Sequence, residues 1–316
     1  MQAMEEQLNE LRALTAKAKN RLTETGIPRV AMVQGKIPEH ELSAVYDPMV
    51  NLILQGSKSM TVGDRTLHYC PANYFVMSVD LPAVGTVWPA ATGEPYLAVA
   101  LTLQPTVVAA LIADLPKPAR SEKAETGFSV AAVTPDLMDA WVRMLRLMER
   151  PVDIPALAPV YEREILYRVL QGPQGAMLRD IATPDSAIGR ISLAIQVIRR
   201  DFAEPLRVEA LAQKAAMSMS AFHRHFKAVT ALSPVQYQKR IRLLQARTLL
   251  VVGGQSVTRA AFEVGYESPT QFSREYARAF GLPPGRDAEQ VLAKYAPPLG
   301  SGAKKSPSRA SHAATH

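Results

Sequence analysis

Arginine, lysine, histidine and hydroxyl side chains recur at matching positions in two segments of the chain. The segment SMSAFHRHFKAVTALSP runs from Ser218 to Pro234, and SPTQFSREYARAFGLPP runs from Ser268 to Pro284. Serine opens both segments, and phenylalanine, arginine, an aromatic residue and a Leu-x-Pro ending follow at equal spacing. Arginine can pair with guanine through two hydrogen bonds and lysine can neutralise phosphate. The repeated cations therefore suit a nucleic acid.

Both segments have the period of an amphipathic helix. Phe222 and Phe226 fall on one face of the first, and Phe272 and Tyr276 fall on one face of the second. We expect these aromatic faces to be buried. The polar side chains are the candidate DNA contacts: Ser220, His223, Arg224 and Lys227 in the first segment, and Thr270, Gln271, Ser273 and Arg274 in the second.

A shorter amphipathic stretch precedes each segment, VEALAQKAA at 208–216 and VTRAAFEVG at 257–265. A tight connection joins each stretch to its segment, so each pair predicts a helix-turn-helix unit. The stretch at 233–251 predicts a long helix, because it lacks Gly and Pro after its start. Two units held by this spacer would enter successive major grooves of double-stranded DNA, about 34 Å apart. Two helical hairpins kept only for packing are the alternative.

Charge is divided unevenly along the chain. Residues 1–189 hold 17 Lys and Arg against 21 Asp and Glu, a net charge of −4. Residues 190–316 hold 19 against 8, a net charge of +11, within an overall +7. A basic half is typical of a protein that binds a polyanion, although a solvated basic surface is the simpler alternative.

Residues 188–285 resemble the DNA-binding domain of AraC/XylS-type transcriptional regulators. The second unit of that family reads Gly, Phe or Tyr, x, Ser, then Phe-x-Arg-x-Phe or Tyr and a basic residue. The matching residues here are Gly265, Tyr266, Ser268, Phe272, Arg274 and Tyr276. Ala277 departs at the basic position, and LPPGRDAEQ departs from the family after the unit, so the resemblance does not predict the last helix.

The first half contains short β-rich runs such as VAMVQG, VNLILQG and NYFVMSV, broken by Gly, Pro and Asp. They predict antiparallel strands in a sandwich or barrel, with a hairpin turn at Gly63-Asp64. Residues 26–103 also resemble the N-terminal domain of one branch of the same family, through phrases such as YDP, LQGSK and SVDLP. That resemblance implies a cupin-like β-barrel whose natural ligand is often unidentified. We expect the barrel to sense a small-molecule effector, and a regulator that responds to no ligand is the alternative.

Helical periods flank these strands, at 1–22 and again after Pro105. We expect these helices to carry homodimer contacts. The fold class is therefore α+β, with a cupin-like barrel and flanking helices followed by an all-α part with two helix-turn-helix units. The predicted domains are 1–185 for sensing and dimerisation, 186–296 for DNA binding, and 297–316 as a disordered tail.

The sequence contains few residues or motifs that would suit an enzyme. A metal-dependent cupin enzyme is the main rival, but the strand region supplies only His40 and His68, without a His-x-His pair. No phosphate-binding glycine loop or nucleophile-elbow motif occurs, so we expect no catalysis, metal or cofactor. Cys70 fits either plain packing or thiol sensing. The aromatic residues that fit either a ligand cavity or a core are Tyr46, Tyr74, Trp88 and Tyr96.

No apolar run approaches the roughly 20 residues of a membrane span, and the N-terminus is charged where a signal peptide would be apolar. We expect a cytoplasmic regulator of transcription, with promoter DNA as partner and contact with RNA polymerase open. The sequence does not decide between activation and repression.

Overall fold

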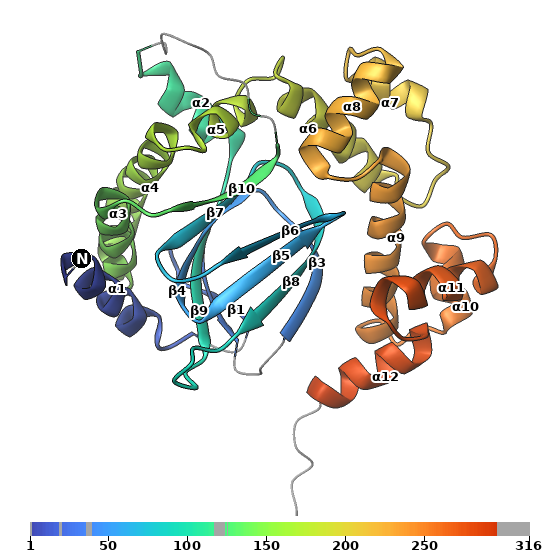
Figure 1. Cartoon of the computed structure of the whole chain (residues 1–316), viewed down its shortest axis with the longest axis horizontal. Coiled ribbons are helices and arrows are strands. Elements are labelled where there is room, and N and C mark those ends of the chain that lie inside the picture. Colours follow the sequence, from blue (N-terminus) through green and yellow to red (C-terminus); the bar gives the residue numbers. More distant parts are fainter. Residues whose placement is uncertain (1, 19–20, 36–39, 117–123, 125, 296–316) are drawn as a thin grey trace, which may run out of the picture. The chain divides into compact units, whose positions relative to one another are not determined.

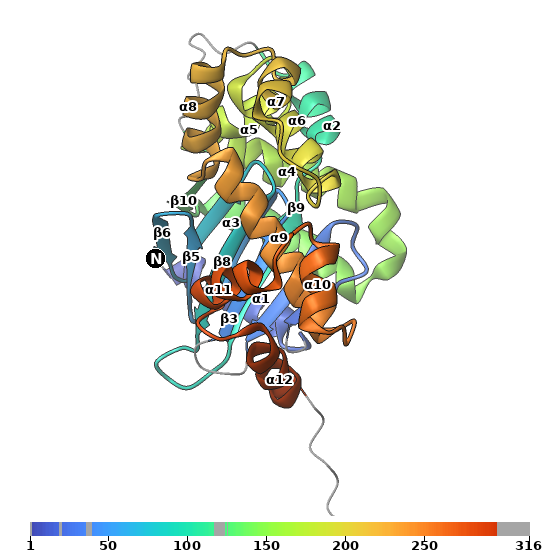
Figure 2. The ribbon, with the colours of Figure 1, turned by 90° about the vertical axis from the view of Figure 1, so that its right-hand side faces the viewer.

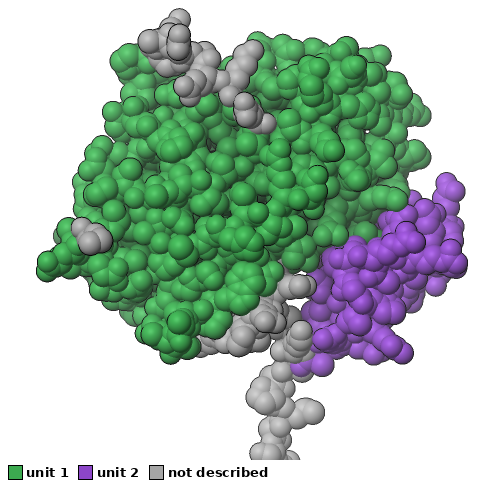
Figure 3. Space-filling view, viewed as in Figure 1, with its two compact units in different colours: residues 1–245 green, residues 246–316 purple. Residues whose placement is uncertain are grey.

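The computed structural model describes residues 2–18, 21–35, 40–116, 124 and 126–295. The chain forms two compact units, residues 1–245 and residues 246–316 (Figure 3). The first unit contains all of the described strands.

Ten strands form two antiparallel sheets (Figure 1). The six-stranded sheet has the order β1 (Arg21–Glu24), β2 (Val30–Gly35), β9 (Tyr96–Thr102), β4 (Met49–Gln55), β7 (Asn73–Met77) and β10 (Phe128–Ala132). The four-stranded sheet has the order β3 (His40–Tyr46), β8 (Leu81–Trp88), β5 (Ser57–Val62) and β6 (Arg65–Tyr69). The β-rich first half is therefore as predicted.

The prediction of a barrel needs correction, because the barrel is not closed. Within the described residues, no strand pairing joins the two sheets. The chain leaves the first sheet after a register shift between Ile53 and Gln55, and it enters the second sheet through Gly56, whose φ is 74°. A Cβ at Gly56 would collide with the carbonyl oxygen of Trp88, so the sharp change of sheet requires glycine here. Such a corner divides the strands into two layers instead of one continuous ladder.

The hairpin at Gly63-Asp64 is confirmed. Val62 of β5 pairs with Arg65 of β6, which leaves Gly63 and Asp64 as a two-residue turn. Gly63 has a φ of 60°, the left-handed conformation that such turns need.

Helices pack on the six-stranded sheet (Figure 1). They are α1 (Gln2–Thr15), α2 (Pro105–Ala113), α3 (Pro135–Arg146), α4 (Ile154–Gln171) and α5 (Gly175–Ile181), with short 3-10 turns at Leu147–Glu149 and Pro151–Asp153. Leu11 of α1 and Trp141 of α3 are fully buried. The Arg12 Nε atom donates to the Leu54 carbonyl oxygen at 2.9 Å and fixes α1 to β4.

The helix predicted over 1–22 is shorter than expected. It ends at Thr15, whose hydroxyl donates to the Leu11 carbonyl oxygen at 2.8 Å, and residues 21–24 pair with β2 as strand β1. Edge pairing of the backbone therefore overrides the helical spacing of Leu22, which is 64% exposed.

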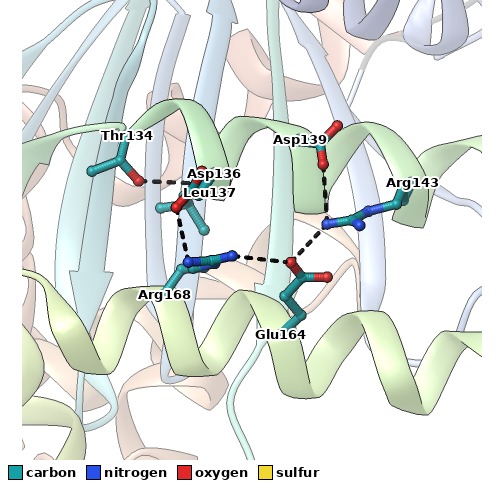
Figure 4. Close-up of polar contacts among 7 residues, drawn as sticks. All are labelled: Thr134, Asp136, Leu137, Asp139, Arg143, Glu164 and Arg168. Atoms are coloured by element: carbon teal, nitrogen blue, oxygen red, sulfur yellow. Dashed lines mark hydrogen bonds and ion pairs between the residues drawn. The ribbon is translucent and has the colours of Figure 1, made fainter.

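Ion pairs join α3 to α4 (Figure 4). The Arg143 Nη2 atom lies 2.7 Å from Glu164 Oε1 and 3.1 Å from Asp139 Oδ2. Arg168 reaches Asp136 Oδ2 at 2.8 Å and Glu164 at 3.6 Å. Glu164 is shared by both arginines, so the two helices are held as one layer.

The described residues after α5 form seven helices: α6 (Ala187–Arg200), α7 (Val208–Lys214), α8 (Met219–Thr230), α9 (Pro234–Val251), α10 (Val257–Glu263), α11 (Pro269–Phe280) and α12 (Pro284–Tyr295). Figure 2 shows α6, α7 and α8 grouped together. The domain boundary predicted at 185 lies in the turn between α5 and α6, while the two compact units divide within α9. The tail predicted to be disordered, 297–316, lies outside the described residues.

Candidate nucleic-acid interface

Helix α8 carries the first set of predicted DNA contacts. Ser218 caps its N-terminus, because the Ser218 hydroxyl accepts a hydrogen bond from the Ala221 amide at 3.3 Å. Phe222 and Phe226 are fully buried, with ring centroids 5.5 Å apart. The four predicted residues, Ser220, His223, Arg224 and Lys227, are all exposed. The structure therefore presents the first set together.

Helix α11 has the same arrangement of capping serine, buried aromatic pair and polar face. Ser268 accepts from the Gln271 amide at 3.3 Å, and the rings of Phe272 and Tyr276 are buried 5.5 Å apart. Of the second predicted set, Thr270, Gln271 and Arg274 are exposed, and Ser273 is half-buried.

Two members of this second set already have partners within α11. The Ser273 hydroxyl donates to the Pro269 carbonyl oxygen at 2.8 Å, and the Gln271 amide nitrogen donates to Glu275 Oε1 at 3.3 Å. Arg274 and Thr270 are thus better placed than Ser273 for an external partner.

The turn before each helix has the same backbone conformation. Ala216 has a φ of 50° before α8, and Gly265 has a φ of 84° before α11. The next amide, of Met217 or Tyr266, donates to the carbonyl oxygen five residues earlier at 3.0 Å in both copies. The duplication seen in sequence is therefore a duplication of structure.

The helix ends also match. Ala231 closes α8 with a φ of 56°, and Gly281 closes α11 with a φ of 79°. Their amides donate to the Lys227 and Ala277 carbonyl oxygens at 2.8 and 2.9 Å. A left-handed residue at this position is a common helix ending, and it normally favours glycine.

The cations of both helices are available to an anion. Within the described residues, no carboxylate lies at ion-pair distance from Arg224, Lys227 or Arg274. The exposed Arg278 adds a cation that sequence reasoning missed, one residue beyond the unusual Ala277. Exposed cations on a capped helix can meet phosphates and guanine edges in a major groove.

Helix α12 is fixed by a buried network that the sequence did not suggest. Arg247 Nε and Nη2 lie 2.8 and 2.9 Å from the two oxygens of Asp287, which is 4% exposed. The Tyr276 hydroxyl donates to the same carboxylate at 2.7 Å, and burial raises the pKa of Tyr276. The network joins α9, α11 and α12, so the departure at LPPGRDAEQ still forms a helix.

Other residues weighed from the sequence lie in the strand region of the first compact unit. Cys70 is exposed at a turn after β6, so its packing interpretation is wrong, and its Sγ lies 3.5 Å from Asn73 Oδ1. Tyr74 and Tyr96 are buried within the first unit. Among the described side chains, no group of three or more His, Cys, Asp and Glu could hold a metal ion. The described helices also include none that is long and apolar enough to cross a membrane.

Two family models match the chain. The model of the AraC-type transcriptional regulator N-terminus matches residues 26–177, and a helix-turn-helix domain model matches residues 211–290. These matches define a class of transcriptional regulators rather than enzymes. The chain belongs to the AraC/XylS family of transcriptional regulators, as its repeated motifs predict.

Curated relatives include the HTH-type transcriptional activator RhaS. RhaS of Salmonella schwarzengrund is 33% identical over 152 residues, which cover 46% of this chain and 54% of RhaS. RhaS of Escherichia fergusonii is 35% identical over 139 residues, which cover 42% and 49%. The chain spans about half the length of the curated relatives it matches.

Solved structures of ToxT from Vibrio cholerae share the fold. The unsaturated fatty acid bound form has a TM-score of 0.52 and 10% identity, and the match covers 81% of this chain and 94% of ToxT. Another crystal form has a TM-score of 0.54 and 9% identity, over 82% and 97%. The likeness supports a mixed fold with a sheet-rich N-terminal part and a helical C-terminal part.

Proposed function

We propose that the protein is a sequence-specific DNA-binding transcriptional regulator that responds to a small-molecule effector. Helices α8 and α11 would act as the recognition helices of two helix-turn-helix units, formed by α7–α8 and α10–α11. Residues 186–296 would bind double-stranded promoter DNA, and residues 1–185 would bind the effector.

The repeated unit carries this proposal. Each copy combines a serine cap, a buried aromatic pair and an exposed arginine, at positions 224 and 274. Packing alone explains the cap and the aromatic pair. It does not explain an arginine held exposed, without a carboxylate partner in the described residues, at the same place in both copies. Base and phosphate contacts explain that repetition.

A small-molecule effector is supported by the N-terminal family match and by the ToxT fold. ToxT has been solved with an unsaturated fatty acid bound, and this chain shares its architecture. We propose that the effector binds between the two facing sheets.

We also propose a homodimer that forms through the helical layer. Val160 of α4 is 55% exposed, beside a groove that Leu111, Leu115 and Tyr167 help to line. The ion pairs between α3 and α4 keep this surface rigid. The charged Arg163, Glu164 and Arg168 also line the groove, and such a surface of apolar and charged side chains suits a second copy of the chain. A regulator bound at a promoter in the cytoplasm could then contact RNA polymerase.

The test begins with genome-wide mapping of the sites that the full chain occupies. Duplexes from those sites and scrambled duplexes are then compared by fluorescence anisotropy at several salt concentrations. We expect tighter binding to the mapped sequences, with an affinity that falls as salt rises. Equal affinity for both duplexes would rule out sequence-specific regulation.

A further inference from the structure

Lys58 lies inside the two-sheet layer, where a charged side chain is rare. It pairs in register with Tyr69 of β6 and Val87 of β8, so all three point from the same face of the four-stranded sheet. That face is the inner one, because Tyr69 stacks on Phe75 of the other sheet with ring centroids 5.5 Å apart. Lys58 is only 7% exposed.

The Lys58 amine has no carboxylate at ion-pair distance within the described residues, and the centroid of the Tyr46 ring lies 5.2 Å from the amine nitrogen. Burial lowers the pKa of Lys58 to about 8. Near neutral pH the amine is still mostly protonated, so the described residues leave its buried charge unneutralised. Such a charge is costly unless an anion reaches it.

Gly85 lies directly against the amine end of Lys58. A Cβ on Gly85 would lie 3.0 Å from Lys58 Cε, 3.6 Å from Lys58 Nζ and 2.7 Å from the Tyr46 hydroxyl. Any larger residue at this point of β8 would crowd both side chains. The glycine thus lets the side chains of Lys58 and Tyr46 pack closely against β8 on the inner face.

Hydroxyl donors face the same interior. Tyr96 is 1% exposed, and its hydroxyl has no hydrogen-bond partner within the described part of the chain. Tyr69 is 3% exposed, and its hydroxyl reaches Asn51 Oδ1 only at 3.5 Å. Tyr96 and Tyr46 lie close enough to Tyr69 to raise its pKa further, beyond the effect of burial. Burial raises the pKa of Tyr96, and the phenol of Tyr46, whose ring lies 5.2 Å from the Lys58 amine, raises it further. Buried polar atoms are nearly always paired, so the unpaired Tyr96 hydroxyl indicates a missing partner.

We propose that Lys58 and the Tyr96 hydroxyl bind the carboxylate of a small organic acid between the two sheets. The proposal rests on the proposed function, in which this domain senses an effector, and it names the chemical class of that effector. One amine and neutral phenols match a single negative charge, whereas a phosphate dianion would remain partly uncompensated. The neighbouring Phe75 and Met60 would contact an apolar body, since both are buried on the inner faces.

The test measures thermal unfolding of the full chain with benzoate and octanoate. Benzamide and octanamide are the uncharged counterparts, and inorganic phosphate is the alternative anion. We expect at least one carboxylate to raise the melting temperature, because it binds only the folded state, and we expect its amide to have no effect. No shift with either carboxylate, an equal shift with the amide, or a shift with phosphate alone would overturn the proposal.

Variants locate the response. Lys58→Met should weaken the carboxylate affinity by about tenfold or more, because it removes the charge and keeps the stem. Tyr96→Phe should weaken it less. Lys214→Met, at an exposed lysine of α7, should respond like the wild type. Without added acid, Lys58→Met should melt at or above the wild-type temperature, which shows that the variant folds. A full response in Lys58→Met would exclude Lys58 as the anchor.

DNA binding by the same preparations separates this proposal from the proposed function. If the wild type binds mapped duplexes while no carboxylate stabilises it, the carboxylate site is wrong and the regulator stands. If a carboxylate stabilises it through Lys58 and no DNA is bound, the site stands and the regulator is wrong.

Discussion

The Tyr237 hydroxyl of α9 donates a hydrogen bond to the backbone carbonyl oxygen of Asp80, 2.7 Å away and 157 positions earlier in the chain. Arg199 of α6 forms ion pairs with the Asp80 carboxylate and, at 3.4 Å, with Asp47. The Gly127 amide also donates to the Val229 carbonyl oxygen in the last turn of α8, at 3.1 Å. The segment that leads into β10 therefore contacts the helix that carries Arg224. In the proposed function, this contact would couple an effector in the sheets to the helix that binds DNA.

Tyr237→Phe should destabilise the first compact unit by about 1 kcal/mol, because it leaves the partly buried Asp80 carbonyl without this donor. Urea unfolding of the full chain measures the change in free energy. Tyr161→Phe is the control, since the half-buried Tyr161 hydroxyl makes no hydrogen bond within the described residues. Equal losses in the two variants would mean that the Asp80 contact contributes nothing of its own.

Gly281→Ala should destabilise the second unit by about 1 kcal/mol. Nothing lies within 4 Å of a Cβ at Gly281, so the cost comes from its φ of 79° alone. Gly285→Ala within α12 is the matched variant, because its φ is not left-handed and its nearest neighbour would be 4.0 Å away. We expect Gly285→Ala to stabilise by up to about 1 kcal/mol through helix propensity. Thermal unfolding measures whether each variant is more or less stable than the wild type. A change in the same direction for both variants would show that the left-handed backbone at Gly281 is not the cause.

Arg224→Ala and Arg274→Ala should each reduce base discrimination by roughly 1–3 kcal/mol, at different halves of the binding site. Both arginines are exposed at equivalent helix positions, where contact with guanine is possible. Anisotropy with mapped and scrambled duplexes measures the discrimination. If both variants lose affinity equally for the two duplexes, the arginines contact only the backbone of the DNA.

Lys227→Ala should weaken binding to all duplexes alike and lower the salt slope by about one unit, because we propose that this exposed lysine neutralises a phosphate. The residue at the equivalent position of α11 is Ala277. The helix-turn-helix unit that contains α8 should therefore contribute more of the DNA affinity than the unit that contains α11. Titrations over a range of salt concentrations test this. A change in sequence preference instead of slope would assign Lys227 to a base.

Stability should rise with pH through the Lys58 amine. Burial lowers the pKa of Lys58 from 10.5 to about 8. Between these values the unfolded chain binds the proton more strongly than the folded one, so the free energy of unfolding increases as pH rises. The difference between wild type and Lys58→Met isolates this effect from other groups. It should shift in favour of the wild type by roughly 3 kcal/mol at most between about pH 8 and about pH 10. Urea unfolding across this range measures it, and a flat difference would show that Lys58 is solvated or paired.

Local pattern alone determined the duplicated helices. The spacing of Phe222 and Phe226 predicts a buried face, and the predicted polar residues on the opposite face of this helix are exposed as expected, because helical period and side-chain direction are set within one turn. The turn at Gly63 was predictable for the same reason, since φ > 0 is a property of one residue. Ser273 differs from the prediction of an exposed polar residue, because its hydroxyl donates to the Pro269 backbone carbonyl. Helical periodicity does not predict such a hydrogen bond.

Tertiary structure alone decided the rest. A strand pattern does not specify which edges pair, so the open two-sheet layer could not be distinguished from a closed barrel. Lys58 lies in a short alternating run of β5, where lysine would normally face water, and the six-stranded sheet, with Phe75 and Tyr96, encloses it. Asp287 likewise gains its partners Arg247 and Tyr276 from other helices. Burial and pairing between distant segments depend on how the whole chain packs. A short segment of sequence does not determine these tertiary contacts.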